Sequence, residues 1–99
     1  MAYFHLKLLP PRPTFPADMT DAERGAMDKH FAYWQQKADE RVAIVVGPVF
    51  DTNGAYGMAV VETDDESAAK ALGDNDPVVK AGLGFGYAVA SIPSAILRT

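Results

Sequence analysis

The chain has 99 residues, the size of one domain, and we treat residues 1–99 as a single domain. It has no cysteine, which excludes disulfides and thiol nucleophiles, and its net charge of −4 does not favour nucleic-acid binding. No apolar run approaches the roughly 18 residues that a membrane helix needs. The N-terminus does not resemble a signal peptide, so we expect a cytoplasmic protein without membrane contact.

The first third of the chain predicts a strand, a stiff loop and a long helix. Residues Tyr3 to Leu9 are mostly aromatic and apolar, and the prolines that follow end the strand because proline cannot donate to a sheet ladder. The loop from Pro10 to Met19 is long for so small a domain, and such loops often carry function. Thr20 and Glu23 match the capping box that starts a helix.

This predicted helix presents one continuous face with a histidine in it. The positions that recur at spacings of three and four are Met27, His30, Phe31, Trp34 and Ala38. Histidine gains and loses a proton near neutral pH and is the commonest general acid or base. His30 is therefore a candidate catalytic residue, and a buried structural histidine is the alternative.

The middle of the chain predicts a β-hairpin with two apolar faces. Residues Val42 to Phe50 form a valine-rich run, Asn53-Gly54 is typical of a tight turn, and Tyr56 to Thr63 form the return strand. We assign Val42, Ile44 and Val46 to one face, and Ala43 and Val45 to the other. A sheet with one face in water would alternate apolar with polar residues. We therefore expect helices on one face and a second copy of the chain on the other, in a homodimer.

The last third predicts a short helix and a final strand. The helix covers Asp64 to Leu72 and ends at Gly73, and the strand covers Phe85 to Ile92. Between them, Asp76-Pro77 has the pattern of a helix N-cap followed by proline at the first helical position. The order βαββαβ predicts an α+β, ferredoxin-like fold with an antiparallel four-stranded sheet and two helices on one face.

Two further patterns indicate no cofactor. The glycine-rich run at 82–86 lacks the preceding strand and the following helix of a nucleotide-binding loop. His5, His30 and an aspartate could supply a two-histidine, one-carboxylate metal site, but the spacing of a metal motif is missing. We expect neither a metal nor another cofactor.

Several segments, taken in order, resemble the YCII-related (YciI-like) family. They are Tyr3-Phe4, Pro10 to Phe15, Asp18-Met19-Thr20, His30 to Trp34, Gly47-Pro48-Val49, Gly54 with Gly57, and Asp76-Pro77 with Ala81-Gly82. The resemblance implies a dimeric α+β barrel, in which the sheets of two subunits face each other, with His30 and Asp76 as the catalytic centre. One characterised branch of the family eliminates hydrogen chloride from a chlorinated hydroxyhydroquinone, and similar barrels include muconolactone isomerases.

The functional hypothesis is a lyase or isomerase that moves a proton on a small cyclic or aromatic metabolite, such as a hydroxyquinol- or muconolactone-like compound. His30 would move the proton and Asp76 would orient its ring. The predicted substrate-binding residues are Phe4, Tyr33, Trp34 and Met58 as apolar walls and Arg12 as an anchor for an anionic group. The alternatives are a solvent-facing Arg12 and, for the whole protein, a non-catalytic ligand-binding or purely structural dimeric module.

Overall fold

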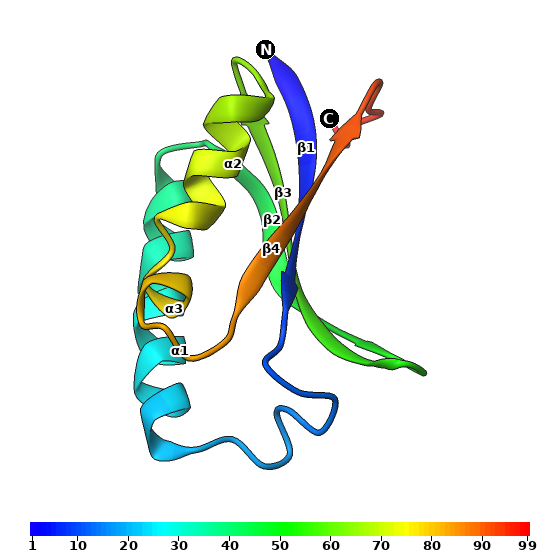
Figure 1. Cartoon of the computed structure of the whole chain (residues 1–99). Helices are drawn as coiled ribbons and strands as arrows, with labels where there is room; N and C mark the ends of the chain where they lie inside the picture. The colour runs from blue at the N-terminus through cyan, green and yellow to red at the C-terminus, as the bar shows by residue number, and fades with distance from the viewer.

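A computed structural model describes all 99 residues. The elements in chain order are β1 (Ala2–Leu9), α1 (Asp21–Asp39), β2 (Ala43–Asp51), β3 (Gly54–Thr63), α2 (Glu66–Asp74), α3 (Pro77–Lys80) and β4 (Gly86–Ile92). The strands form one antiparallel sheet in the order β2-β3-β1-β4, and the helices lie together on one face of it (Figure 1). The predicted ferredoxin-like α+β fold is therefore confirmed, with the single-turn α3 as a third helix.

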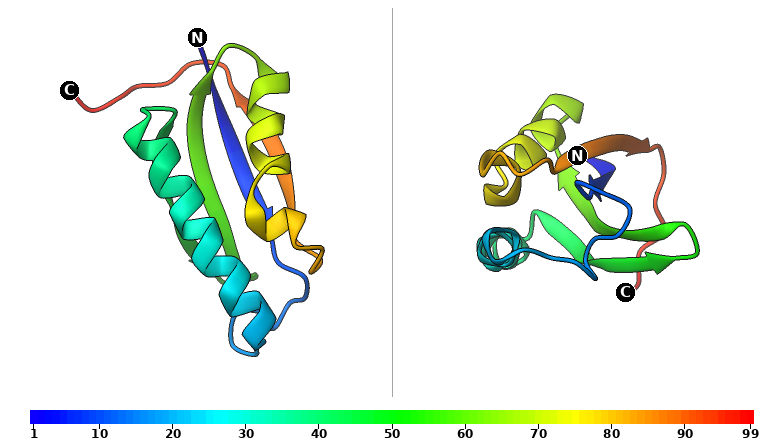
Figure 2. Two further views of the ribbon diagram at one scale, coloured as in Figure 1. Left: turned by 90° about the vertical axis from the view of Figure 1, so that its left-hand side faces the viewer. Right: turned by 60° about the horizontal axis from the view of Figure 1, so that its bottom comes forward.

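Two helices lie side by side in front of the sheet (Figure 2). α1 packs against β2, whereas α2 packs against β4, and α3 contacts α1. The predicted capping box starts α1: the Glu23 amide donates to Thr20 Oγ1 at 3.1 Å, and the Thr20 amide donates to Glu23 Oε1 at 2.9 Å. Neither α1 nor the shorter helices contain a stretch long and apolar enough to cross a membrane.

The core lies between the helices and the sheet in two clusters. One cluster surrounds Trp34 and contains Phe4, Leu6, Ala43, Ala59, Val61 and Ala69. The other surrounds Val78 and contains Leu8, Phe15, Ala26 and Phe85. Since α1 supplies a residue to each cluster, the turn of α1 that carries His30 is fixed from both sides.

The alternation along β2 changes at a β-bulge. Ala43 pairs with Val61 and Val45 pairs with Val60, so Ile44 is an extra residue in β2. Val46, which pairs with Ala59, therefore shares the helix side with Ala43. The predicted grouping of Ala43 with Val45 is wrong, because a period of two takes no account of an inserted residue.

The other face of the sheet carries no helix. One row of neighbours across it is Val45, Val60, His5 and Ala90, and the next is Gly47, Met58, Lys7 and Ala88. The Lys7 ammonium lies 4.5 Å from the centre of the Tyr56 ring, which shields part of its charge. This largely apolar face, hereafter the open face, is the surface on which a second copy is predicted.

Candidate active site

His30 lies on the face of α1 that points toward the sheet, and its exposed fraction is only 6%. Its Nδ1 atom is 2.6 Å from Oδ2 of Asp76, a residue 46 positions further along the chain. The fold brings the two together because α1 and α3 pack against each other. The two residues that the sequence singled out for acid–base chemistry are therefore in direct contact.

Asp76 is fully buried, and its two oxygens have different partners. Oδ1 accepts a hydrogen bond from the Val78 amide at 3.0 Å, which makes Asp76 the N-cap of α3, with Pro77 as the first helical residue. Oδ2 faces side chains instead. Asp76 is thus the N-cap of α3 through Oδ1 and, at the same time, a partner of His30 through Oδ2.

Three side chains converge on Oδ2 of Asp76. Trp34 donates its indole N–H at 2.9 Å and Tyr87 donates its hydroxyl at 2.6 Å, beside the contact with His30. The Trp34 N–H also lies 3.0 Å from the Tyr87 oxygen. No buried side-chain nitrogen or oxygen in the protein lacks a partner, so this polar network is complete.

These contacts determine the charge on the carboxylate. Burial alone would raise the pKa of Asp76, but hydrogen bonds from His30, Tyr87 and the Val78 amide together leave that pKa below its ordinary value. Burial, and then the nearby charge of Asp76, raise the pKa of Tyr87. At neutral pH, Asp76 is therefore ionised while Tyr87 keeps its proton.

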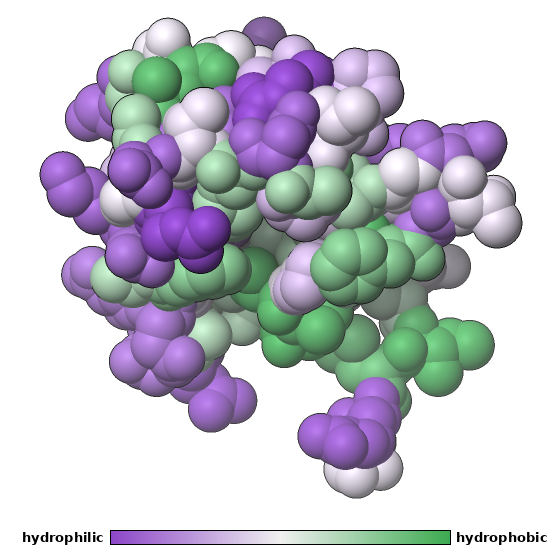
Figure 3. All heavy atoms as spheres, turned by 90° about the horizontal axis from the view of Figure 1, so that it is seen from below, coloured by the Kyte–Doolittle hydropathy of each residue, from purple (hydrophilic) through white to green (hydrophobic).

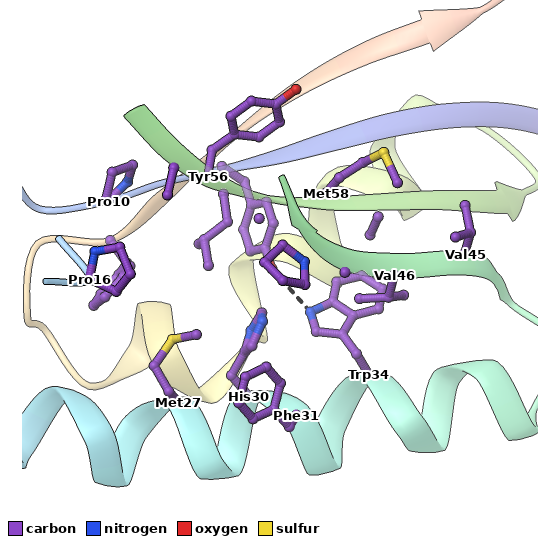
Figure 4. A pocket seen from close by; sticks show the side chains of 18 of the residues that line it. Pro10, Pro16, Met27, His30, Phe31, Trp34, Val45, Val46, Tyr56 and Met58 are labelled. Atoms are coloured by element: carbon purple, nitrogen blue, oxygen red, sulfur yellow. Dashed lines mark hydrogen bonds between the residues drawn. The ribbon is translucent and has the colours of Figure 1, made fainter. Parts of the chain in front are cut away.

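His30 borders a cavity of about 480 Å³ between α1, the β2–β3 hairpin, the proline loop and β4. Apolar side chains gather around this hollow, whereas the helix side of the molecule is mostly hydrophilic (Figure 3). The polar side chains in its wall are those of His30, Trp34, Gln35, Tyr56 and Tyr87, and no Lys, Arg, Asp or Glu lines it. Figure 4 shows His30 and Trp34 extending from α1 toward the strands.

Only some of the residues predicted as apolar walls of the pocket border this cavity. Trp34 and Met58 border it, although the Met58 side chain points away from α1, on the far side of β3 (Figure 4). Phe4 does not border it: β1 directs this side chain toward the helices, into the core around Trp34. Tyr33 donates its hydroxyl to the Leu72 carbonyl at 2.7 Å and does not line the cavity.

Arg12, the predicted anion anchor, does not border the cavity either. Its guanidinium donates to both oxygens of Glu23 at 2.7 Å, to the Asp18 carbonyl at 2.8 Å and to the Asp18 carboxylate at 3.0 Å. The Arg12 hydrogen bond is the main reason that the pKa of Glu23 falls to about 2. Arg12 therefore fastens the proline loop to the start of α1, and the loop contributes Phe15 and Pro16 to the cavity wall.

The alternative metal site is not assembled. His5 lies on the open face of the sheet, whereas His30 lies on the helix side. No group of three or more His, Asp or Glu side chains is placed to hold a metal ion.

Sequence reasoning missed Tyr87 as a site residue. The alternation along β4 puts Tyr87 on the helix side with Phe85 and Val89, but nothing local indicates that its hydroxyl reaches Asp76. Gly73, predicted to end the second helix, lies inside α2 instead. A Cβ atom there would come within 2.9 Å of the Tyr87 ring, so the glycine makes room for that ring.

The fold and the site together define a class of protein: a ferredoxin-like α+β domain with a buried histidine–aspartate pair beside an apolar cavity. The model of the YCII-related domain matches residues 4–93, and the chain belongs to this family. No curated protein matches the chain.

One solved structure with a similar fold is 5-chloro-2-hydroxyhydroquinone dehydrochlorinase (TftG) from Burkholderia phenoliruptrix AC1100, in complex with 2,5-dihydroxybenzoquinone. The TM-score is 0.56 and the sequence identity 18%, over 88% of this chain and 90% of that chain. At this identity the similarity establishes the fold and nothing finer.

Proposed function

We propose that this protein is a small-molecule enzyme of the lyase or isomerase type, in which His30 transfers a proton to or from a bound ligand. The observation that carries the proposal is the 2.6 Å contact between His30 and the buried Asp76 at the wall of a ligand-sized cavity. Small-ligand sites are typically apolar with a few polar groups, which matches this cavity.

In this proposal His30 and Asp76 have different roles. His30 borders the cavity, whereas Asp76 lies behind it and does not. Asp76 engages Nδ1, so Nε2 is the ring nitrogen left for the ligand. A carboxylate that holds the ring in place and stabilises its protonated form plays the supporting role known from other acid–base pairs.

The cavity favours a ring-bearing substrate, such as one of the hydroxyquinol or muconolactone kind. Its volume of about 480 Å³ lies within the usual range for small-molecule sites. No cationic side chain lines it, because Arg12 is committed to Glu23 and Asp18. The ligand of the structurally similar dehydrochlorinase, 2,5-dihydroxybenzoquinone, is a ring of this size and supports the proposal by analogy.

We further propose that the protein works as a homodimer through the open face of the sheet. The support is the two rows that contain Val60 and Met58, which are apolar apart from His5 and Lys7 and which no helix covers. Closed twofold dimers are the commonest soluble oligomers, and a sheet face offers such a self-complementary surface.

The test is a panel of hydroxylated quinones, hydroxyquinols and unsaturated lactones, with 2,5-dihydroxybenzoquinone included, screened by thermal shift and then for turnover. A compound that binds the native state raises its melting temperature. We expect turnover of a bound compound by the wild type and by the His5→Gln control, and its loss in His30→Gln with binding retained. Binding without turnover by the wild type would identify a non-catalytic binding module instead. Turnover by His30→Gln at the wild-type rate would refute the role of His30.

A further inference from the structure

We infer that Trp34 and Tyr87 fix the tautomer of His30, keeping its proton on Nδ1 and leaving Nε2 free to accept one. They are positioning residues, since they act on His30 through Asp76. Only the use of the free Nε2 atom, to take a proton from a ligand, rests on the proposed function. The tautomer itself follows from the hydrogen-bond geometry.

The indole N–H of Trp34 can only donate a hydrogen bond. It lies 2.9 Å from Oδ2 of Asp76 and 3.0 Å from the Tyr87 oxygen. The Tyr87 oxygen is therefore an acceptor toward Trp34. The single hydroxyl proton of Tyr87 is then left for Asp76, whose Oδ2 is 2.6 Å away.

Asp76 consequently meets donors at both of its oxygens. Oδ2 accepts from Trp34 and Tyr87, and Oδ1 accepts from the Val78 amide at 3.0 Å. A proton on either oxygen would compete with a donor already in place, so the group is a carboxylate. A carboxylate only accepts, which means that Nδ1 of His30 is the donor in their 2.6 Å contact.

The consequence concerns the second nitrogen of the ring. A neutral imidazole has one N–H, and with that proton on Nδ1 the Nε2 atom is an acceptor. In the competing arrangement, Asp76 holds the proton and donates it to Nδ1, and Nε2 carries the N–H. That form could donate to a ligand but could not take a proton from it. Trp34 and Tyr87 disfavour this arrangement because both stabilise the ionised carboxylate.

The packing keeps both donors in place. Trp34 has an exposed fraction of only 2% in the core around it. The Tyr87 ring packs so closely on α2 at Gly73 that no side chain would fit between them. The centre of the Tyr87 ring is 6.3 Å from the centre of the Trp34 ring. Neither side chain can turn away without disturbing the core.

Long-range ¹H–¹⁵N NMR of the histidine rings tests the inference without a substrate, at a pH where the same spectra show both rings neutral. The chain has two histidines, so His5→Gln assigns the His30 signals. We expect the wild type to carry its proton on Nδ1. We expect Tyr87→Phe, and more so Tyr87→Phe with Trp34→Phe, to increase the Nε2–H population by about tenfold, the size of effect that a hydrogen bond to a charged group has on an equilibrium.

Tyr33→Phe is the matched control, because it removes a tyrosine hydroxyl that contacts the Leu72 carbonyl and not Asp76. We expect it to leave the tautomer unchanged. An Nε2–H tautomer in the wild type would overturn the inference, even if the variants fail to fold. So would folded Tyr87 and Trp34 variants whose tautomer matches the wild type. If no compound of the panel turns over while His30 holds its proton on Nδ1, the proposed function fails and this inference stands.

Discussion

At the scale of single residues, Asp76 is the position on which most of the site depends. Replacing it with alanine removes the α3 cap and takes the acceptor away from the Tyr87 hydroxyl and from Nδ1 of His30. We expect Asp76→Ala to lower the free energy of unfolding by about 3–5 kcal/mol, the usual cost of breaking a buried charged network. Urea denaturation followed by circular dichroism measures it.

Asp65→Ala is the control for Asp76→Ala. Asp65 caps α2 by accepting from the Ala68 amide at 2.8 Å, but it is exposed and has no network behind it. We expect it to cost about 1 kcal/mol, as for an ordinary helix cap. Equal losses in the two variants would mean that Asp76 is no more than a cap.

At the scale of elements, the contact between α2 and β4 depends on the absence of a side chain at Gly73. Alanine favours helices over glycine by about 1 kcal/mol, yet a Cβ at Gly73 would lie 2.9 Å from the Tyr87 ring. We expect Gly73→Ala to destabilise the fold by about 1–3 kcal/mol, as overpacking does. Gly25→Ala in α1, where nothing lies within 4 Å, should instead be neutral or stabilising in the same thermal melts. A stabilising Gly73→Ala would contradict the close packing.

The proline loop is a second element whose order depends on one side chain. Lysine keeps the charge of Arg12 but cannot reproduce its paired hydrogen bonds to Glu23. We expect Arg12→Lys to speed hydrogen exchange at the Phe15, Ala17 and Met19 amides, which donate within the loop, by about tenfold. Arg24→Lys, on an exposed position of α1, is the control. Unchanged exchange in Arg12→Lys would show that the prolines alone hold the loop.

The elements that the sequence predicted correctly are those encoded by local signals. The capping box at Thr20, the helical spacing around His30 and the Asp76-Pro77 cap each involve residues within a few positions of one another. The residues that it misplaced depend on contacts across the chain. Arg12 has a partner 11 positions away in Glu23, and Tyr87 reaches Asp76 from another element. No periodicity contains that information, and the bulge at Ile44 breaks the periodicity itself.

At the scale of the whole molecule, the open face predicts the oligomeric state. Val45 lies on this face opposite Val60, and 48% of it is exposed in the single chain. We expect the wild type to sediment at twice the chain mass at micromolar concentration, and Val45→Glu to sediment as a folded monomer, because burying an unpaired charge is costly. Ile96→Glu, at a fully exposed position near the C-terminus, should remain a dimer. A monomeric wild type would refute the dimer.

Asp76 both caps α3 and contacts His30, and this combination affects how such a site would be lost in evolution. Its Oδ1 atom caps α3 and its Oδ2 atom accepts hydrogen bonds from buried donors, whatever happens in the cavity. A descendant that no longer needed acid–base chemistry would still require the aspartate in order to fold, while the position of His30 would be released from selection. Among sequences that share this architecture, we therefore expect the aspartate to be kept for folding, and the histidine to be kept only where the proposed acid–base chemistry is kept.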